Sequence, residues 1–187
     1  MDAVHELAVL EKMAEELQAY LLSDVLFWQM QAGSNFPKLS LGRLLLARER
    51  LRAFEHQLSP AQRTDLQKAE QQIESLLGQW QVAAEKHAGH ELRSRANLWQ
   101  RFWEECGEAP GHCADNYAQE VSQRAIAGLL LREFPRIAET PEARVLLALD
   151  STVRPRLGAN GFVWDESLKP AFPESDFWFL YGKPARR

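Results

Sequence analysis

The sequence has few cysteines, no long apolar run and no basic leader. Cys106 and Cys113 are its only two cysteines, too few for the multi-bridge framework of a small secreted domain. No run of about 18 apolar residues, the length that spans a bilayer, occurs. The first residues are acidic where a signal peptide is basic. These absences predict a cytoplasmic protein without membrane association.

The motifs of common enzyme and cofactor sites are also missing. There is no phosphate loop of the form GxxxxGKS/T or GxGxxG, and no GxSxG nucleophile elbow. No Glu-x-x-His pair occurs, which argues against the di-iron site of helical bundles. No motif indicates membership of a known family. We therefore predict no cofactor, and the sequence favours a non-enzymatic protein over an enzyme.

What the chain does contain is the composition of an ordinary globular domain. Its 187 residues are 45% hydrophobic and 26% charged, which suffices for one sizeable core. The net charge of −4 argues against a protein that coats nucleic acid or anionic lipid, because both attract basic surfaces.

Apolar residues recur at helical spacing along most of the chain. The spacing predicts an acidic first helix over residues 2–31 and a basic second helix over residues 40–58, whose opposite charges suit an antiparallel pair. Two later helices are expected over residues 114–134 and 141–153, because prolines follow the first and open the second.

The longest predicted element runs from Ser59 to Cys106. Ser59, Pro60 and Gln62 supply an N-cap, a first-turn proline and a capping box. A continuous helix of about 48 residues would be about 70 Å long, which is long for a small domain. We therefore expect a kink or break near Ala88–Gly89, where glycine weakens the helix.

The helical spacing is lost after Leu157, where glycines and prolines separate short aromatic runs. Residues 157–187 are predicted to form an extended, aromatic-rich, non-helical segment packed on the helices within the same domain, with a possible short strand at Phe177–Tyr181. The predicted fold is therefore all-α: an antiparallel bundle of four to five helices over residues 1–156, with a long central helix and this C-terminal segment.

Polar residues interrupt the apolar stripes at two places. His87, Glu91 and either Ser94 or Arg95 fall where the central stretch should be apolar, and Asp24 takes a similar position on the first helix. If these side chains meet inside the bundle, they could bind a small anion or perform acid–base chemistry. The alternatives are an exposed polar collar and a structural ion-pair network without function.

Aromatic residues add one more candidate to this ligand site. Trp99 and Trp103 lie four residues apart on the central stretch, among six tryptophans in the chain. The favoured interpretation is that the aromatics of the C-terminal segment pack against them. The alternative is a partly open groove in which Trp99 stacks on a base, a sugar or a partner side chain.

Two clusters contain metal-ligand residue types without the spacing of a known site. The first is His87, His90 and Glu91, which lacks a matching second helix. The second is made of Cys106, His112 and Cys113, which lacks a Cys-x-x-Cys pair. We predict no metal site, with Cys106 a small core residue and Cys113 the opening of the next helix.

These observations favour a non-enzymatic helical scaffold or protein-interaction domain. A central helix longer than its neighbours would leave an apolar end for a second subunit or another protein. The alternative is a binder of a small anionic ligand, or an enzyme, that uses Asp24, His87, Glu91 and Arg95. Nucleic-acid binding is the third and least favoured hypothesis, because the charge balance does not support it.

Overall fold

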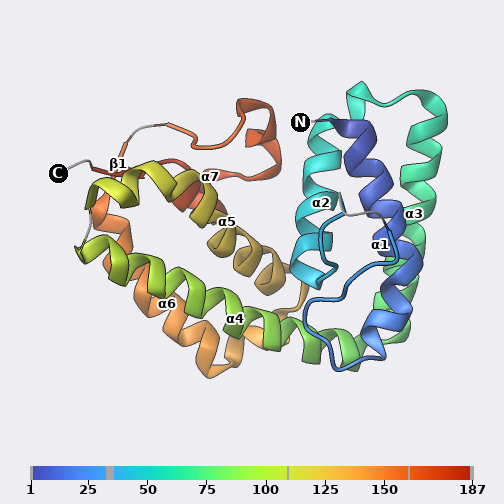
Figure 1. Cartoon of the computed structure of the whole chain (residues 1–187), viewed down its shortest axis with the longest axis horizontal. Helices are drawn as coiled ribbons and strands as arrows, with labels where there is room; N and C mark the ends of the chain where they lie inside the picture. The colour runs from blue at the N-terminus through green and yellow to red at the C-terminus, as the bar shows by residue number, and fades with distance from the viewer. Residues whose placement is uncertain (1, 33–35, 109, 160, 186–187) are drawn as a thin grey trace. The chain divides into compact units, whose positions relative to one another are not determined.

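A computed structural model describes residues 2–32, 36–108, 110–159 and 161–185 of the chain. The fold is all-α, as predicted: within these ranges the only sheet has two short strands (Figure 1). The chain forms two compact units, Met1–His90 and Glu91–Arg187. The prediction of a single domain over the whole chain stays a prediction.

The first unit is built on three helices that run in alternating directions (Figure 1). Helix α1 (Ala3–Leu21) packs against both α2 (Leu41–Phe54) and α3 (Pro60–Gln79), and the first part of α4 (Gln81–Glu108) completes the unit. A single 3-10 turn, η1 (Glu55–Gln57), follows α2. The core of this unit is aliphatic, because the facing positions of the helices are mostly leucine.

Side-chain caps fix where these helices begin. The predicted capping box of α3 is present, with the Ser59 hydroxyl and the Gln62 amide each bonding the other's backbone N–H. Asp2 caps α1 and Ser40 caps α2 by accepting hydrogen bonds from backbone N–H groups of the first turn. Of the charges of α2, Arg50 pairs with Glu6 of α1, whereas others pair with α3. The pairs with α3 are Arg48–Glu74 and Arg52–Glu70.

The first helix is ten residues shorter than its apolar pattern predicts, since α1 ends at Leu21 rather than at residue 31. The Ser23 hydroxyl donates to the Tyr20 carbonyl, which ends the helix with a local hydrogen bond. The chain then folds back, and the Trp28 indole N–H donates to the Glu16 carboxylate at 2.7 Å. The apolar residues after Leu21 therefore belong to a loop that returns to α1.

The central stretch is broken, but not at the predicted place. Helix α3 ends at Gln79 and α4 begins at Gln81, with Trp80 between them in a non-helical conformation (φ −112°, ψ 36°). Gly89 lies inside α4 instead. The prediction of a break at Ala88–Gly89 is wrong because the fully buried Ala84, Ala88 and Leu92 stabilise the helix there by more than the roughly 1 kcal/mol that glycine costs.

The second unit contains the rest of α4, α5 (Pro110–Glu133) and α6 (Pro141–Val153). Helix α5 begins four residues before the predicted Ala114, with a proline at its start, where the missing N–H is no loss. Thr140 caps α6 by accepting a hydrogen bond from the Ala143 N–H. Two 3-10 segments, η2 (Pro135–Glu139) and η3 (Arg154–Arg156), flank α6.

The C-terminal segment contains short helical turns that its glycines and prolines do not predict. These are η4 (Glu166–Ala171), α7 (Glu174–Phe177) and η5 (Trp178–Leu180), the last two lying where a strand was a possibility. The only described strands are β1 (Leu157–Gly158) and β2 (Lys183–Pro184), which pair antiparallel.

The segment packs on α5 by aromatic side chains that also bond the backbone. The Tyr117 hydroxyl donates to the Phe179 carbonyl at 2.7 Å, and the Trp164 indole donates to the Ala118 carbonyl at 2.9 Å. Phe172, Phe177 and Phe179 are almost completely buried. No helix among the described residues has the length and apolar character needed to cross a bilayer.

Candidate functional site at the α3–α4 bend

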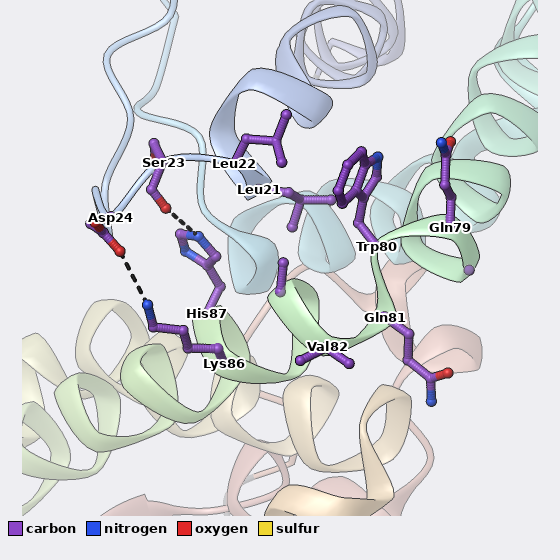
Figure 2. A pocket seen from close by; sticks show the side chains of 12 residues that line it. Leu21, Leu22, Ser23, Asp24, Gln79, Trp80, Gln81, Val82, Lys86 and His87 are labelled. Atoms are coloured by element: carbon purple, nitrogen blue, oxygen red, sulfur yellow. Dashed lines mark hydrogen bonds and ion pairs between the residues drawn. The ribbon is translucent and has the colours of Figure 1, made fainter.

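The bend at Trp80 creates an open cavity of about 600 Å³ within the first unit, which we call the elbow pocket (Figure 2). It contains two of the sequence-predicted site residues, Asp24 and His87. The end of α1 and the following turn form one wall, and the bend itself forms the other. The lining residues are Leu21, Leu22, Ser23, Asp24, Gly78, Gln79, Trp80, Gln81, Val82, Ala83, Lys86 and His87.

His87 has a structural role at the base of this pocket. Its ring is 5% exposed, lies 4.5 Å from the Tyr20 ring between centroids, and places Nε2 3.0 Å from the Ser23 carbonyl oxygen. Burial lowers the pKa of His87, because desolvation disfavours the imidazolium. A neutral ring whose Nε2–H donates to Ser23 holds the turn after α1 against α4.

Asp24 is almost fully exposed and forms an ion pair with Lys86, with the carboxylate 3.1 Å from Nζ. The hydrogen bond from Lys86 lowers the pKa of Asp24. Figure 2 shows this pair and the His87–Ser23 contact side by side along α4. Because the pair is solvated, it contributes charge to the rim of the pocket rather than stability to the fold.

Apolar side chains make up much of the rest of the surface. Val82 is 80% exposed and Leu22 is 58% exposed, and both line the pocket. Trp80 is half-buried and also lines the pocket, and its indole N–H is buried without a hydrogen-bond partner. The arrangement is an apolar surface with a charged edge.

The structure brings Glu91 and Arg95 together. Both are buried in the second unit, and Arg95 donates through Nε and Nη2 to Glu91 at 3.1 and 2.7 Å. Its Nη1 donates to the Gln123 side chain at 2.7 Å. Neither residue lines the elbow pocket. A buried arginine requires such partners. The arrangement is that of a structural ion-pair network, one of the alternatives named above for these residues.

Trp99 lies in an aromatic cluster of the second unit and is fully buried. Its ring stacks on Phe102 at 5.7 Å and meets Trp103 edge-on at 5.5 Å, with Tyr117 of α5 at 6.1 Å. Trp99 therefore has no open face on which a base or sugar could stack. Its contacts join α4 to α5, whereas the aromatics of the C-terminal segment pack mainly on one another.

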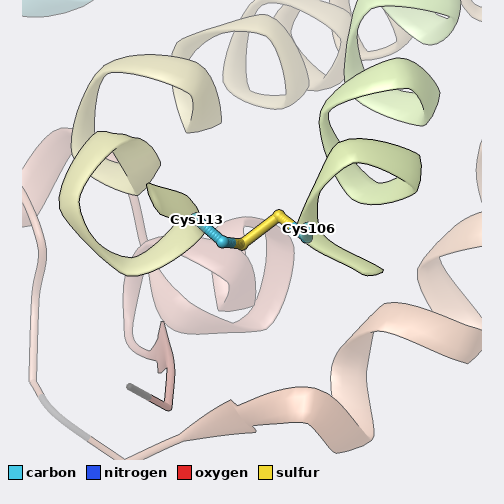
Figure 3. The surroundings of a disulfide bond; sticks show 2 residues. All are labelled: Cys106 and Cys113. Carbon is cyan, nitrogen blue, oxygen red and sulfur yellow. A yellow bond between two sulfur atoms is a disulfide. The ribbon is translucent and has the colours of Figure 1, made fainter. Parts of the chain in front are cut away.

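Cys106 and Cys113 form a disulfide between the end of α4 and the start of α5 (Figure 3). Both sulfurs are bonded to each other, so neither is a thiolate that could hold zinc. The prediction that Cys106 is a simple core residue is wrong, since it is half-buried and covalently linked. The side chain of His112, the third member of that cluster, lies outside the described residues.

Metal-ligand residues do not gather elsewhere in the part of the chain that the structure describes, where no group of three His, Cys, Asp or Glu side chains could hold an ion. The Nε2 atom of His87 is hydrogen-bonded to the Ser23 carbonyl oxygen, and the Glu91 carboxylate is hydrogen-bonded to Arg95. The elbow pocket therefore offers one exposed carboxylate and one exposed ammonium group, which neutralise each other.

Sequence reasoning missed the apolar members of the site. Val82 lies off the buried stripe of its helix, and Leu22 follows the last turn of α1. The signal for Val82 was an apolar residue that falls outside the helical spacing of the other apolar residues in its stretch, which places it on the outer face. Also missed was the buried ion pair of Arg124 with Asp150, which joins α5 to α6 through bonds of 2.6 to 3.0 Å.

Comparisons with protein-family models, with curated proteins and with solved structures give no significant match. The function proposed below therefore rests on the geometry of the chain alone.

Proposed function

We propose that this protein is a non-enzymatic interaction domain that binds a protein partner at the elbow pocket. The observation that carries the proposal is the exposure of Val82 and Leu22 around a cavity of about 600 Å³. Large apolar side chains grouped at a concave surface are typical of a binding site, because their contact with water is unfavourable. The partner is expected to insert an apolar side chain beside Trp80.

The charged edge of the pocket supports a polypeptide partner. Asp24 and Lys86 present one charge of each sign beside the apolar surface, so the rim can pair with polar groups that flank an apolar anchor. His87 contributes by holding the turn that carries Leu22, Ser23 and Asp24 in place. A surface that is already ordered loses less conformational entropy when it binds.

The alternative function, binding of a small anion or acid–base catalysis, has less support. Glu91 neutralises Arg95 inside the second unit, and Asp24 neutralises Lys86 at the pocket. An anion would have to displace one of these carboxylates. We therefore do not extend the proposal to an enzyme.

A site-specific photocrosslinker tests the proposal in cells that produce the protein. Placed at residue 82, it should give a discrete crosslinked product, and Leu22→Glu should abolish that product by putting a charge in the apolar surface. Residue 145 is the matched control, since Val145 is also an exposed valine on a helix, at 52%. Equal labelling from residues 82 and 145, or a product insensitive to Leu22→Glu, would contradict the proposal.

The mass of the product also separates the two kinds of partner. A product of twice the 21.4 kDa chain mass indicates a homo-oligomer, and any other mass indicates a different protein. A cytoplasmic location is the remaining part of the proposal. The Cys106–Cys113 bond makes it testable, because cytoplasmic thiols keep most disulfides reduced. Cell fractionation with immediate alkylation of free thiols reports both the compartment and the state of the bond.

A further inference from the structure

The Cys106–Cys113 disulfide lies at a second open cavity, which we call the disulfide cavity. It has a volume of about 550 Å³ and lies entirely in the second unit. Both cysteines line it, together with Trp103, Pro155, Leu157 and Pro184. A structural disulfide is usually enclosed by side chains, whereas this one has an open space on one side that a small molecule can enter.

The two cysteines of this bond are not equally exposed. Cys106 is half-buried, whereas Cys113 is only 2% exposed. The more exposed residue, Cys106, is therefore the one that a thiolate from the cavity or from solvent attacks. Exchange requires the attacking sulfur to approach along the S–S axis, so access to one sulfur decides which half of the disulfide leaves.

The helix termini favour the same direction of exchange, in which Cys106 is attacked and Cys113 leaves. Cys106 lies in the last turn of α4, where the backbone carbonyls disfavour negative charge. Cys113 lies near the N-terminus of α5, where the backbone N–H groups stabilise a thiolate. Attack on Cys106 would thus release the sulfur that carries the negative charge more easily, and such a leaving group speeds exchange.

We propose that Cys106–Cys113 is an exchange-active redox site that reacts with dithiols, small molecules or proteins that carry a pair of neighbouring thiols. One thiolate of the dithiol attacks the Cys106 sulfur, the S–S bond breaks, and Cys113 leaves as a thiolate that takes up a proton. The second thiol of the reagent then attacks the reagent sulfur that is bonded to Cys106. The mixed disulfide breaks, and Cys106 leaves as a thiolate that takes up a proton. The dithiol is oxidised to a disulfide, and two electrons and two protons pass to the two cysteines.

The rest of the unit holds the two helices together without the disulfide. The Trp103 and Tyr117 rings lie 6.1 Å apart and connect the end of α4 to α5 through buried contacts. The two cysteines are only seven residues apart, and closing so short a loop restricts the unfolded chain less than a long one does. Reduction should therefore leave the fold intact, which a reversible redox site requires.

The first test measures how the folded, oxidised full-length chain is reduced by dithiothreitol. Samples are quenched with acid, alkylated and weighed by mass spectrometry. The rate should rise in proportion to dithiothreitol concentration, because attack occurs on the folded state. A rate that becomes independent of dithiothreitol concentration would mean that the protein must unfold first, which would overturn the proposal.

The second test uses glutathione and peptide mapping to locate the mixed disulfide. The adduct trapped by rapid acid quench should be on Cys106, at least about tenfold over Cys113, since exposure and leaving-group stability favour the same sulfur. Equal amounts on the two cysteines, or more on Cys113, would contradict the asymmetry on which the proposal rests.

Two glycine variants test whether the cavity is the route of access. Gly107 lines the cavity and Gly111 does not, and a side chain added at either position meets no atom within 4 Å of its Cβ. Gly107→Leu should slow reduction by dithiothreitol about tenfold by blocking the approach, while Gly111→Leu leaves the rate within about twofold. Equal rates for the two variants would exclude access through the cavity. If Gly107→Leu fails to fold, the first two tests still decide.

Discussion

His87 connects two segments that are more than sixty residues apart in the sequence. Its ring packs on Tyr20 of α1, and its Nε2 meets the carbonyl of Ser23 just beyond the end of that helix. The side chain is therefore held between the turn after α1 and helix α4. Because burial lowers the pKa of His87, the folded state prefers the neutral ring.

This preference makes stability depend on pH in a defined direction. In the unfolded chain His87 has its ordinary pKa of 6.5, and in the folded chain its pKa is lower. Between these two values the unfolded state binds a proton that the folded state does not, so the free energy of unfolding decreases as pH falls. Well above pH 6.5 the ring is neutral in both states and contributes nothing to the pH dependence.

We expect urea unfolding to show this loss between pH 7 and pH 5, with a slope from His87 of at most about 1.4 kcal/mol per pH unit. His87→Phe keeps an aromatic ring beside Tyr20 but cannot titrate, so its stability should depend less on pH. His56→Ala is the control, because His56 is exposed. Identical pH slopes for His87→Phe and the wild type would show that the folded state does not penalise the imidazolium.

At the scale of the elements, the bend at Trp80 and the continuity of α4 have one cause. Tertiary burial, rather than intrinsic helix propensity, decides where the long stretch stays helical. Gly89 is kept in the helix by its buried neighbours Ala88 and Leu92, and the chain turns at Trp80 instead. The elbow pocket exists only because of that turn.

Gly89→Ala should raise the free energy of unfolding by about 0.5–1 kcal/mol, because alanine loses less entropy in a helix and its Cβ meets no atom within 4 Å. Chemical denaturation measures this gain. Gly182→Ala is the opposite case, since its Cβ would lie 2.7 Å from the Gly158 carbonyl oxygen beside the β1–β2 pair. That variant should be destabilised. A destabilised Gly89→Ala would show that the glycine has a role other than helix tolerance.

At the scale of the whole molecule, the chain folds as two compact units with cores of different composition. The first unit buries mostly aliphatic side chains of α1, α2 and α3. The second buries two aromatic clusters, one between α4 and α5 and one between α5 and the C-terminal segment. The C-terminal segment is therefore part of the core of the second unit.

Deleting residues 163–187 should unfold the second unit and leave the first folded. The deletion removes Phe172, Phe177, Phe179 and Leu180, all nearly fully buried. At about 1.5–3 kcal/mol for each side chain, the loss is comparable with the whole stability of a domain. Hydrogen exchange should show lost amide protection in α5 and retained protection in α1, α2 and α3.

A single substitution should destabilise the second unit by less than the deletion does. Tyr117→Phe removes only the hydrogen bond to the Phe179 carbonyl, so it should cost about 1–2 kcal/mol and leave α5 protected in the native state. If the deletion leaves protection of α5 unchanged, the segment is not part of the core of this unit.

The sequence by itself determined the helical class, the caps and most of the helix starts. Ser59 with Gln62, Ser40 and Thr140 act through hydrogen bonds to residues three positions away, so their effect can be read without the fold. The polar interruptions at His87, Glu91 and Arg95 could also be recognised in the sequence, because a polar residue at an apolar position of a helical repeat departs from the pattern.

Only the tertiary structure decided what those residues contact and where the long helix breaks. Glu91 and Arg95 meet each other, but the partners of His87 and Arg95 include Ser23 and Gln123, far away in the sequence. The Cys106–Cys113 bond joins residues only seven positions apart, but helical spacing does not predict it, because the pairing depends on how the end of α4 packs against the start of α5. Hydrogen bonds, burial and covalent links between distant segments depend on how helices pack, and helical spacing describes one helix at a time.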